Sequence, residues 1–228
     1  MELPLRATRD VDLGIDRVAL GLTGRARRVG PLLERHDFSH RAGDEPFRFR
    51  RTTGAGDFLV DLLLPKGASR AHPPVIEVGL DSVAAPGLAY ALARGPERLD
   101  LRLSEASRVH RFELPIAALD AMLVMKATLV ADGARTEVGR RVVDTADAVM
   151  LAAAASHDAP SLQALAANRM RSEPRRALRW LRERFSDERS AEARRVESHF
   201  AREYRNAGGA AWAVTVVRDF LAALDEQR

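Results

Sequence analysis

Hydrophobic and polar residues alternate near the start of the chain. Within residues 9–16, the apolar residues Val11, Leu13 and Ile15 occupy every second position. A period of two is typical of a strand with one buried face, so we predict a strand here. The same alternation, or a short apolar run, predicts further strands near residues 47–50, 57–64, 75–80, 99–103 and 109–114.

Turn-forming residues separate the strand near residues 47–50 from the strand over residues 57–64. The stretch Thr52-Thr-Gly-Ala-Gly56 places two glycines where a tight turn needs them. The two strands are therefore expected to form a hairpin. Upstream of this hairpin, residues 17–36 are predicted to form a helix that is interrupted near Gly30-Pro31.

The pattern changes to a helical one from Pro115 onward. Pro115 is predicted to occupy the first position of a helix, followed by an Ala-, Met- and Leu-rich run over residues 117–130. Further helices are predicted over residues 137–155, 160–170, 173–185, 188–206 and 209–225. These elements indicate an α+β fold, with a small mixed or antiparallel sheet and flanking helices over residues 1–114. An all-helical region over residues 115–228 follows.

Composition narrows the classes of protein to consider. The 228 residues are 46% hydrophobic and include no cysteine, which excludes disulfides, thiolate metal sites and a cysteine nucleophile. No apolar run approaches the roughly 18 residues of a membrane span, and the N-terminus lacks the apolar segment of a signal peptide. We therefore expect a cytoplasmic protein with no membrane partner.

The charge is unevenly distributed. Lys66 and Lys126 are the only lysines among 36 basic residues, an arginine bias that indicates a GC-rich, bacterial genome. Residues 161–228 hold 14 basic and 10 acidic residues, and this difference of four accounts for the whole net charge of +4. A neutral front and a basic tail favour a contact between the tail and a polyanion.

Three aspartates suggest a metal site. Asp10 and Asp12 lie two residues apart on one predicted strand, which places both side chains on one face about 7 Å apart. Carboxylates so close repel each other unless a cation lies between them, and Mg²⁺ prefers oxygen ligands. Asp61 lies in an apolar run and needs a metal ion or a basic partner. The alternatives are ordinary exposed acids at the first two positions and an arginine partner for the third.

The stretch Arg6-Ala-Thr8-Arg-Asp10-Val-Asp12-Leu13 resembles the R-x-T-x-D-h-D-h signature of nucleotidyltransferase-fold proteins of the AbiEii/AbiGii toxin type, within the polymerase-beta-like superfamily. Val60-Asp61-Leu62 resembles the third carboxylate motif of that superfamily. Leu123-Val-Met-Lys126-Ala and Arg140-Arg-Val-Val-Asp144-Thr-Ala-Asp147 resemble its helical motifs. The resemblance covers residues 5–155 and implies a nucleotidyltransferase-like domain over residues 1–114.

The resemblance also implies roles for individual residues. The implied metal ligands, for two Mg²⁺ ions, are Asp10, Asp12 and Asp61, with Asp57 as the fallback for the third. The residues implied to bind or position the nucleotide are Arg6, Thr8, Lys126 and Asp144, with Asp147 as a second carboxylate that supports the lysine. A solitary lysine on an apolar helix needs a carboxylate or phosphate partner, or it extends to the helix surface.

The implied reaction is transfer of NMP from an NTP to an acceptor such as the 3′ end of a tRNA, by the toxin half of a pair with a cognate antitoxin protein. The superfamily carries a Gly-Gly or Gly-Ser turn ahead of its D-x-D motif, where backbone amides cradle the triphosphate. No glycine lies in the nine residues before Asp10. Two explanations stay open: the chain begins after that motif, or it is a catalytically inactive protein- or RNA-binding module.

An arginine-rich face is predicted on the helix over residues 173–185. Arg175, Arg179 and Arg182 recur at spacings of four and three, which places them on one side of a helix. Such a face can contact several phosphates and bind RNA without regard to sequence. The alternative is an ordinary solvent-exposed helix face in an arginine-biased protein.

Overall fold

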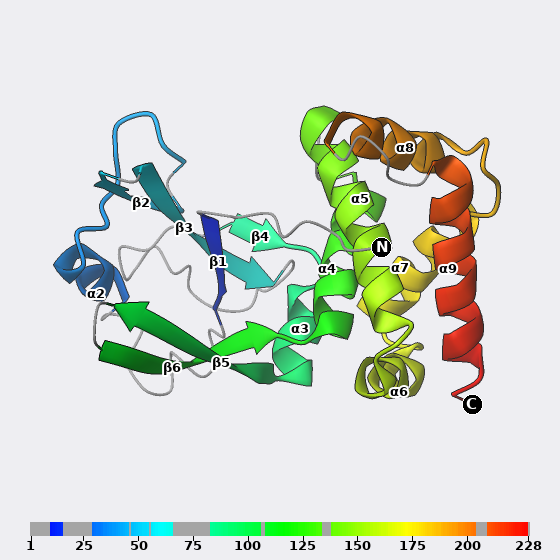
Figure 1. Ribbon diagram of the computed structural model, residues 1–228, viewed down its shortest axis with the longest axis horizontal. Coiled ribbons are helices and arrows are strands. Elements are labelled where there is room, and N and C mark those ends of the chain that lie inside the picture. Colours follow the sequence, from blue (N-terminus) through cyan, green and yellow to red (C-terminus); the bar gives the residue numbers. More distant parts are fainter. Residues whose placement is uncertain are drawn as a thin grey trace. The chain divides into compact units, whose positions relative to one another are not determined.

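A computed structural model describes residues 10–15, 29–45, 47–54, 56–65, 83–105, 108–133, 138–203 and 209–227 (Figure 1). The chain divides into two compact units, Met1–Leu88 and Ala89–Arg228. The first contains a four-stranded sheet, and the second contains a two-stranded sheet and most of the helices. The predicted α+β class is confirmed. The unit boundary falls at Leu88, ahead of the division after residue 114 that the sequence pattern suggests.

The sheet of the first unit is mixed. It consists of β1 (Asp10–Gly14), β2 (Arg48–Thr53), β3 (Gly56–Pro65) and β4 (Val83–Ala85), in the order β1-β3-β2 with β4 also paired to β3. β1 and β4 run parallel to β3, whereas β2 runs antiparallel to it. β3 is thus the central strand, and its residues are positioned by neighbours on both sides.

The predicted hairpin between β2 and β3 is confirmed. Thr53 pairs with Gly56, and the Thr53 hydroxyl donates a hydrogen bond to the Gly56 carbonyl at 3.1 Å. Gly56 has a φ of 117°, a conformation that favours glycine because it has no Cβ. The tight turn therefore sets the register of the whole hairpin.

One face of the first sheet carries the apolar core of this unit. Phe49, Val60, Leu62 and Leu64 are buried there, and α2 (Val29–Arg35) contributes packing residues against them. Strand alternation sends the intervening residues of β2 and β3 to the opposite face. That opposite face, called the charged face below, carries Arg48, Arg50, Asp57 and Asp61.

The structure confirms some of the elements predicted for the first unit, corrects one and leaves others outside the described residues. The strand predicted over residues 9–16 and those near residues 47–50 and 57–64 are confirmed as β1, β2 and β3. The interruption predicted near Gly30-Pro31 in a helix over residues 17–36 was wrong, because both residues lie in the first turn of α2, where a proline is tolerated. Residues 16–28 lie outside the described part. The strand predicted over residues 75–80 also lies outside it. The short strand β4 had no predicted counterpart.

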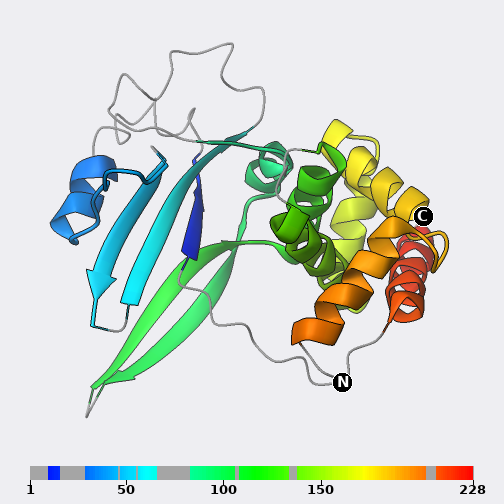
Figure 2. The same ribbon diagram turned by 90° about the horizontal axis from the view of Figure 1, so that it is seen from above.

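The second unit begins with α3 (Leu88–Arg94) and a long hairpin of β5 (Pro96–Glu105) and β6 (Arg108–Ala117). Figure 2 shows this hairpin as a ribbon that extends away from the helices of the same unit. The prediction that Pro115 begins a helix was wrong, because Pro115 lies in β6 opposite Arg98. Both strands of a two-stranded ribbon are edge strands, which is where a proline is tolerated.

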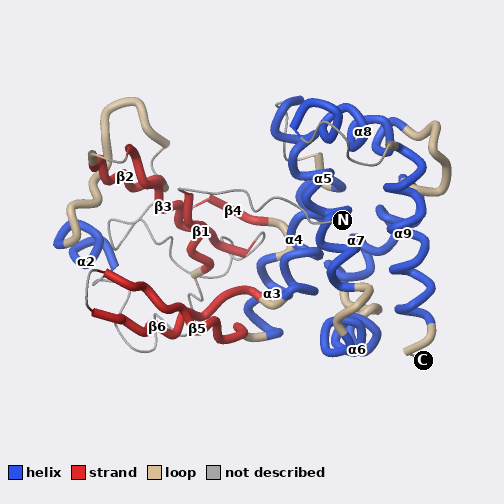
Figure 3. Tube along the Cα trace, in the orientation of Figure 1, coloured by secondary structure: helices blue, strands red, loops and turns tan. Residues whose placement is uncertain are grey.

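Helices make up the rest of the second unit (Figure 3). The helices are α4 (Leu119–Ala131), α5 (Val138–Ala155), α6 (Ala159–Asn168), α7 (Ser172–Arg184), α8 (Ala191–Glu203) and α9 (Ala210–Asp225). The five helices from α5 to α9 match their predicted positions to within a few residues at each end. Their fully buried side chains include Leu123, Val149, Leu181, Val196 and Phe220. Among the described residues, no helix is both long enough and apolar enough to cross a bilayer.

Candidate functional site

Two aspartates lie side by side on the charged face of the first sheet. Asp12 of β1 pairs in register with Asp61 of the parallel strand β3. Residues paired in this way project from the same face, and neighbouring strands lie about 4.8 Å apart. Asp12 is exposed, whereas the side chain of Asp61 is mostly buried. The structure therefore brings together two of the three predicted metal ligands.

The third predicted ligand, Asp10, is described only in its backbone. It pairs with Leu59 two positions before Asp12, which places it on the same face of β1 by strand alternation. Its side chain lies outside the described part of the chain. Arg6 and Thr8, which were expected to orient this strand or to touch phosphate, also lie outside it.

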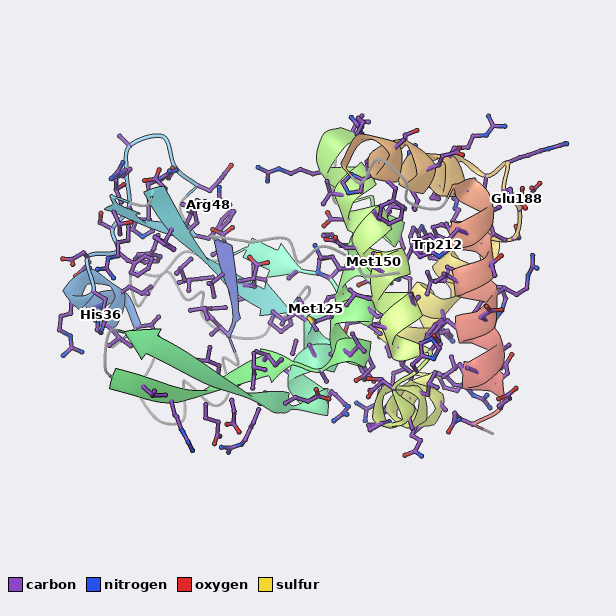
Figure 4. The ribbon with its side chains drawn as sticks, in the orientation of Figure 1. His36, Arg48, Met125, Met150, Glu188 and Trp212 are labelled. Atoms are coloured by element: carbon purple, nitrogen blue, oxygen red, sulfur yellow. The ribbon has the colours of Figure 1, made fainter. Side chains whose placement is uncertain are left out.

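An arginine holds the Asp61 carboxylate. Arg48 of β2, labelled in Figure 4, pairs with Asp61 across the hairpin and donates from Nε at 2.8 Å and from Nη2 at 2.6 Å. The two side chains are only 21% and 14% exposed. A two-point contact of this kind is stronger and more directional than a single hydrogen bond. Asp61 thus has the basic partner that the sequence left open as one of two solutions for its burial.

The donor set can be tested against a divalent cation. Asp12 and Asp61 supply hard carboxylate oxygens on adjacent strands, which suits Mg²⁺ in ligand type and placement. Both oxygens of Asp61 accept hydrogen bonds from Arg48, so a cation would compete with the guanidinium for this carboxylate. Within the described ranges, no group of three or more acidic, histidine or cysteine side chains is arranged to hold a metal ion.

A second ionic group lies further along the same face. Arg50 of β2 donates to Asp57 at 2.6 Å and to both oxygens of Asp44 at 2.6 and 3.0 Å. The Thr52 hydroxyl donates to Asp57 at 2.5 Å. Hydrogen bonds from Thr52 and Arg50 hold the pKa of Asp57 below its ordinary value. Asp57, the fallback metal ligand, is therefore already engaged by two donors.

Lys126 forms a separate charged cluster in the second unit. Its Nζ lies 2.7 Å from an oxygen of Asp144 and 2.9 Å from an oxygen of Asp147, two residues one turn apart on α5. Burial acts to lower the pKa of Lys126, but the two carboxylates outweigh that effect and raise it above its ordinary value. The structure thus brings together the lysine and both acids that the resemblance associated with it.

This cluster retains access to solvent. The side chain of Lys126 is 35% exposed and that of Asp147 is 38% exposed, whereas Asp144 is 6% exposed. Asp144 therefore anchors the ammonium from below, and Asp147 contacts it near the surface. An anchored, partly exposed ammonium can still donate to a phosphate oxygen, because it has three protons to share.

A buried carboxylate on α4 was not predicted from the sequence. Asp120 is fully buried and accepts a hydrogen bond from the Tyr90 hydroxyl at 2.6 Å, with Arg94 Nε at 3.5 Å. Burial, reinforced by this carboxylate, raises the pKa of Tyr90 above its ordinary range. The backbone N–H of Tyr90 in turn donates to Glu173 at 2.7 Å. These contacts tie α3 to α4 and α7, which is a structural role.

Arg48 was also not predicted as the partner of Asp61, although the register of the hairpin identifies it. In the hairpin, paired residue numbers sum to a constant that the turn sets, because Thr53 pairs with Gly56. Applying that sum to Asp61 gives Arg48.

The arginine face predicted from the sequence is present on α7, where Arg175, Arg179 and Arg182 are all exposed.

The chain was compared with protein-family models, with curated proteins and with solved structures, and none of the three comparisons found a match. The assignment of a function therefore depends on the chain's own residues and their geometry.

Proposed function

We propose that this chain is a Mg²⁺-dependent nucleotidyltransferase that transfers NMP from an NTP to an acceptor hydroxyl. The observation that carries the proposal is the in-register placement of Asp12 beside Asp61 on parallel strands. These two residues would hold the metal, with Asp10 as the third ligand. Bound there, Mg²⁺ would neutralise charge on the triphosphate and orient it.

The chain's own residues have distinct tasks in this proposal. The hairpin register holds Asp61 in place, and the two hydrogen bonds from Arg48 orient its carboxylate. The buried opposite face of the sheet makes this arrangement rigid. We assign Lys126 to a nucleotide phosphate, with Asp144 and Asp147 as the residues that position it. In the reaction, the acceptor hydroxyl loses its proton to solvent as its oxygen bonds to the α-phosphorus, and the bond from that phosphorus to the leaving pyrophosphate breaks.

The proposed acceptor is the 3′ end of a tRNA, and the proposed protein partner is a cognate antitoxin. The test is incubation of the purified chain with Mg²⁺, each α-labelled NTP and total bacterial tRNA. We expect label on RNA, and we expect Asp12→Asn to abolish it, because that change removes a metal-binding charge without changing side-chain volume. Asp219→Asn is the matched control, since Asp219 is an exposed residue of α9. Label on protein instead of RNA would change the acceptor and leave the transferase in place.

One observation favours a second candidate function. The guanidinium of Arg48 neutralises Asp61 without any metal ion, as a chain that no longer binds Mg²⁺ would require. On this alternative the chain is a catalytically inactive relative that binds protein or RNA. It is favoured over the transferase if neither RNA nor protein is labelled and if isothermal titration detects no binding of Mg²⁺·NTP.

A further inference from the structure

The exposed face of α7 carries a row of three arginines. Arg175, Arg179 and Arg182 are solvent-exposed, and none of them is in an ion pair with another residue that the structure describes. At 1.5 Å per residue, the stripe they form is about 10 Å long. A fourth arginine of the same helix differs from these three, because Arg176 is paired with Asp132 at 2.5 Å. The three exposed guanidiniums therefore keep their donors available.

The acids of α7 do little to offset this charge. Residues 169–184 contain seven arginines and two glutamates. One of those glutamates, Glu173, accepts the Tyr90 backbone N–H at 2.7 Å and so serves the packing of the unit. The other, Glu183, is exposed near the C-terminal end of the helix. The local excess of positive charge thus remains at the surface.

The placement of two of these arginines works against helix stability. Arg175 closes the first turn of α7, where the helix dipole disfavours a cation, although Glu173 in the same turn offsets part of this effect. Arg179 lies four residues after Arg175 and three before Arg182, spacings at which like charges repel. Of the three, only Arg182, in the last turn, is favoured by the dipole. Residues that depart from a local rule of helix stability in this way are expected at functional sites.

The other face of α7 limits the kind of ligand. Ala177, Leu178 and Leu181 are buried in the core of the second unit, so the helix has no free apolar face to insert into a membrane. What the helix offers is a row of guanidiniums, which bind phosphates through two parallel hydrogen bonds. Nucleic acid presents such phosphates closely spaced along its backbone.

We propose that the exposed arginine face of α7, formed by Arg175, Arg179 and Arg182, binds the phosphodiester backbone of RNA without regard to sequence. The assignment of this RNA as the acceptor depends on the proposed function, whereas the binding itself does not. The face would hold the RNA by charge and hydrogen bonding, and it would leave the bases unread.

The test is fluorescence anisotropy of a labelled RNA stem-loop at a series of salt concentrations. The variant R175Q/R179Q/R182Q should lower the slope of log affinity against log salt by about 2 to 3, because each phosphate contact contributes about 0.7 to 0.9. At about 0.1 M salt this corresponds to an affinity roughly 100- to 500-fold weaker. The control R189Q/R194Q/R218Q removes the same charge from other exposed positions and should keep most of the affinity.

The proposal can be overturned by the melting temperature of the α7 variant or by tighter binding of a ligand other than RNA. The α7 variant should keep or raise its melting temperature, because it removes repulsion between like charges. The proposal is overturned if the α7 variant binds RNA as the wild type does, if both triple variants weaken binding equally, or if the melting temperature drops with the affinity. It is also overturned if vesicles containing phosphatidylserine, or duplex DNA, bind more tightly than the RNA.

This experiment separates the binding proposal from the transferase proposal. Asp12→Asn should bind the RNA stem-loop with wild-type affinity while transferring no label, because Asp12 belongs to the first unit and not to α7. RNA binding without any transfer by the wild type would refute the proposed reaction alone. Transfer without a salt-dependent contribution from α7 would refute the arginine face alone.

Discussion

The ion pair between Arg48 and Asp61 allows a direct test of the metal assignment. Replacing Arg48 by Met removes both hydrogen bonds to Asp61 and leaves a mostly buried carboxylate beside Asp12. Exposed ion pairs contribute about 0–1 kcal/mol, and breaking a fully buried pair costs about 3–5 kcal/mol. With side-chain exposures of 21% and 14%, this pair falls between those cases, so we expect a loss of about 2 kcal/mol.

The effect of Mg²⁺ on this variant is the decisive measurement. Without Arg48, no guanidinium competes with Mg²⁺ for the two oxygens of Asp61, so Mg²⁺ should bind at this carboxylate and stabilise the first unit. A ligand present at about 100 times its dissociation constant adds roughly 2.7 kcal/mol, which is enough to offset the loss. The wild type should gain less, because Mg²⁺ must displace Arg48 from Asp61.

The assay must report on the first unit. Trp180, Trp212 and both tyrosines lie in the second unit, so intrinsic fluorescence does not follow the sheet. Hydrogen exchange of the β3 amides, read by mass spectrometry with and without Mg²⁺, gives the opening free energy where it is needed. Arg51→Met is the matched control, since Arg51 lies on β2 but on the opposite face from Arg48. It should change the free energy by less than about 0.5 kcal/mol.

Two results would refute this reasoning. If Arg48→Met lowers the opening free energy of β3 and Mg²⁺ restores none of it, Asp61 is a structural partner of Arg48 and not a metal ligand. If Arg48→Met behaves like the Arg51 control, the ion pair carries no appreciable stability and the magnitude above is wrong.

Further predictions concern the other charged groups. Two carboxylates raise the pKa of Lys126, so the stability that this cluster gives the second unit should be complete below the ordinary pKa of 10.5. This stability should be lost as pH rises through the higher pKa of the folded state. Lys126→Met should remove this pH dependence of the unfolding midpoint, which tryptophan fluorescence measures. Tyr90→Phe should cost the second unit about 1–3 kcal/mol in urea unfolding, since Asp120 loses its closest donor, and an unchanged midpoint would contradict the buried network. Thr52 lowers the pKa of Asp57, so the stability from this carboxylate is present above the ordinary pKa of 3.8 and is lost as pH falls through the lower pKa of the folded state. Thr52→Val should raise the pKa of Asp57 in an NMR titration. An unchanged pKa of Asp57 would exclude the hydrogen bond from Thr52.

Much of the local structure could be predicted from the sequence because its causes are local. Period-two alternation predicted β1 and β2, an apolar run predicted β3, and the glycines between Thr52 and Gly56 predicted the hairpin. The first helix after residue 118 follows from its Ala-, Met- and Leu-rich composition, and the later helices follow from their apolar periodicity and from the prolines and glycines between them. The main error, at Pro115, arose because a proline is tolerated both at the start of a helix and in an edge strand.

The candidate site divides between sequence and tertiary structure in the same way. The pairing of Arg48 with Asp61 was accessible from sequence, since a tight turn sets the register of its hairpin residue by residue. The pairing of Asp12 with Asp61 was not, because a parallel ladder between strands 49 positions apart has no turn that sets its register. Likewise, only the packing of α4 against α5 brings Lys126 to Asp144 and Asp147.

The sequence by itself therefore determined which residues carry charge, which face of each element they occupy, and where the hairpin turns. Tertiary structure alone decided which of those charges meet. Local preferences act over a few residues, whereas contacts between distant elements depend on how the apolar faces of the whole unit pack together. The buried pair of Asp120 and Tyr90, 30 residues apart, shows this dependence most clearly, since neither residue stands out in the sequence.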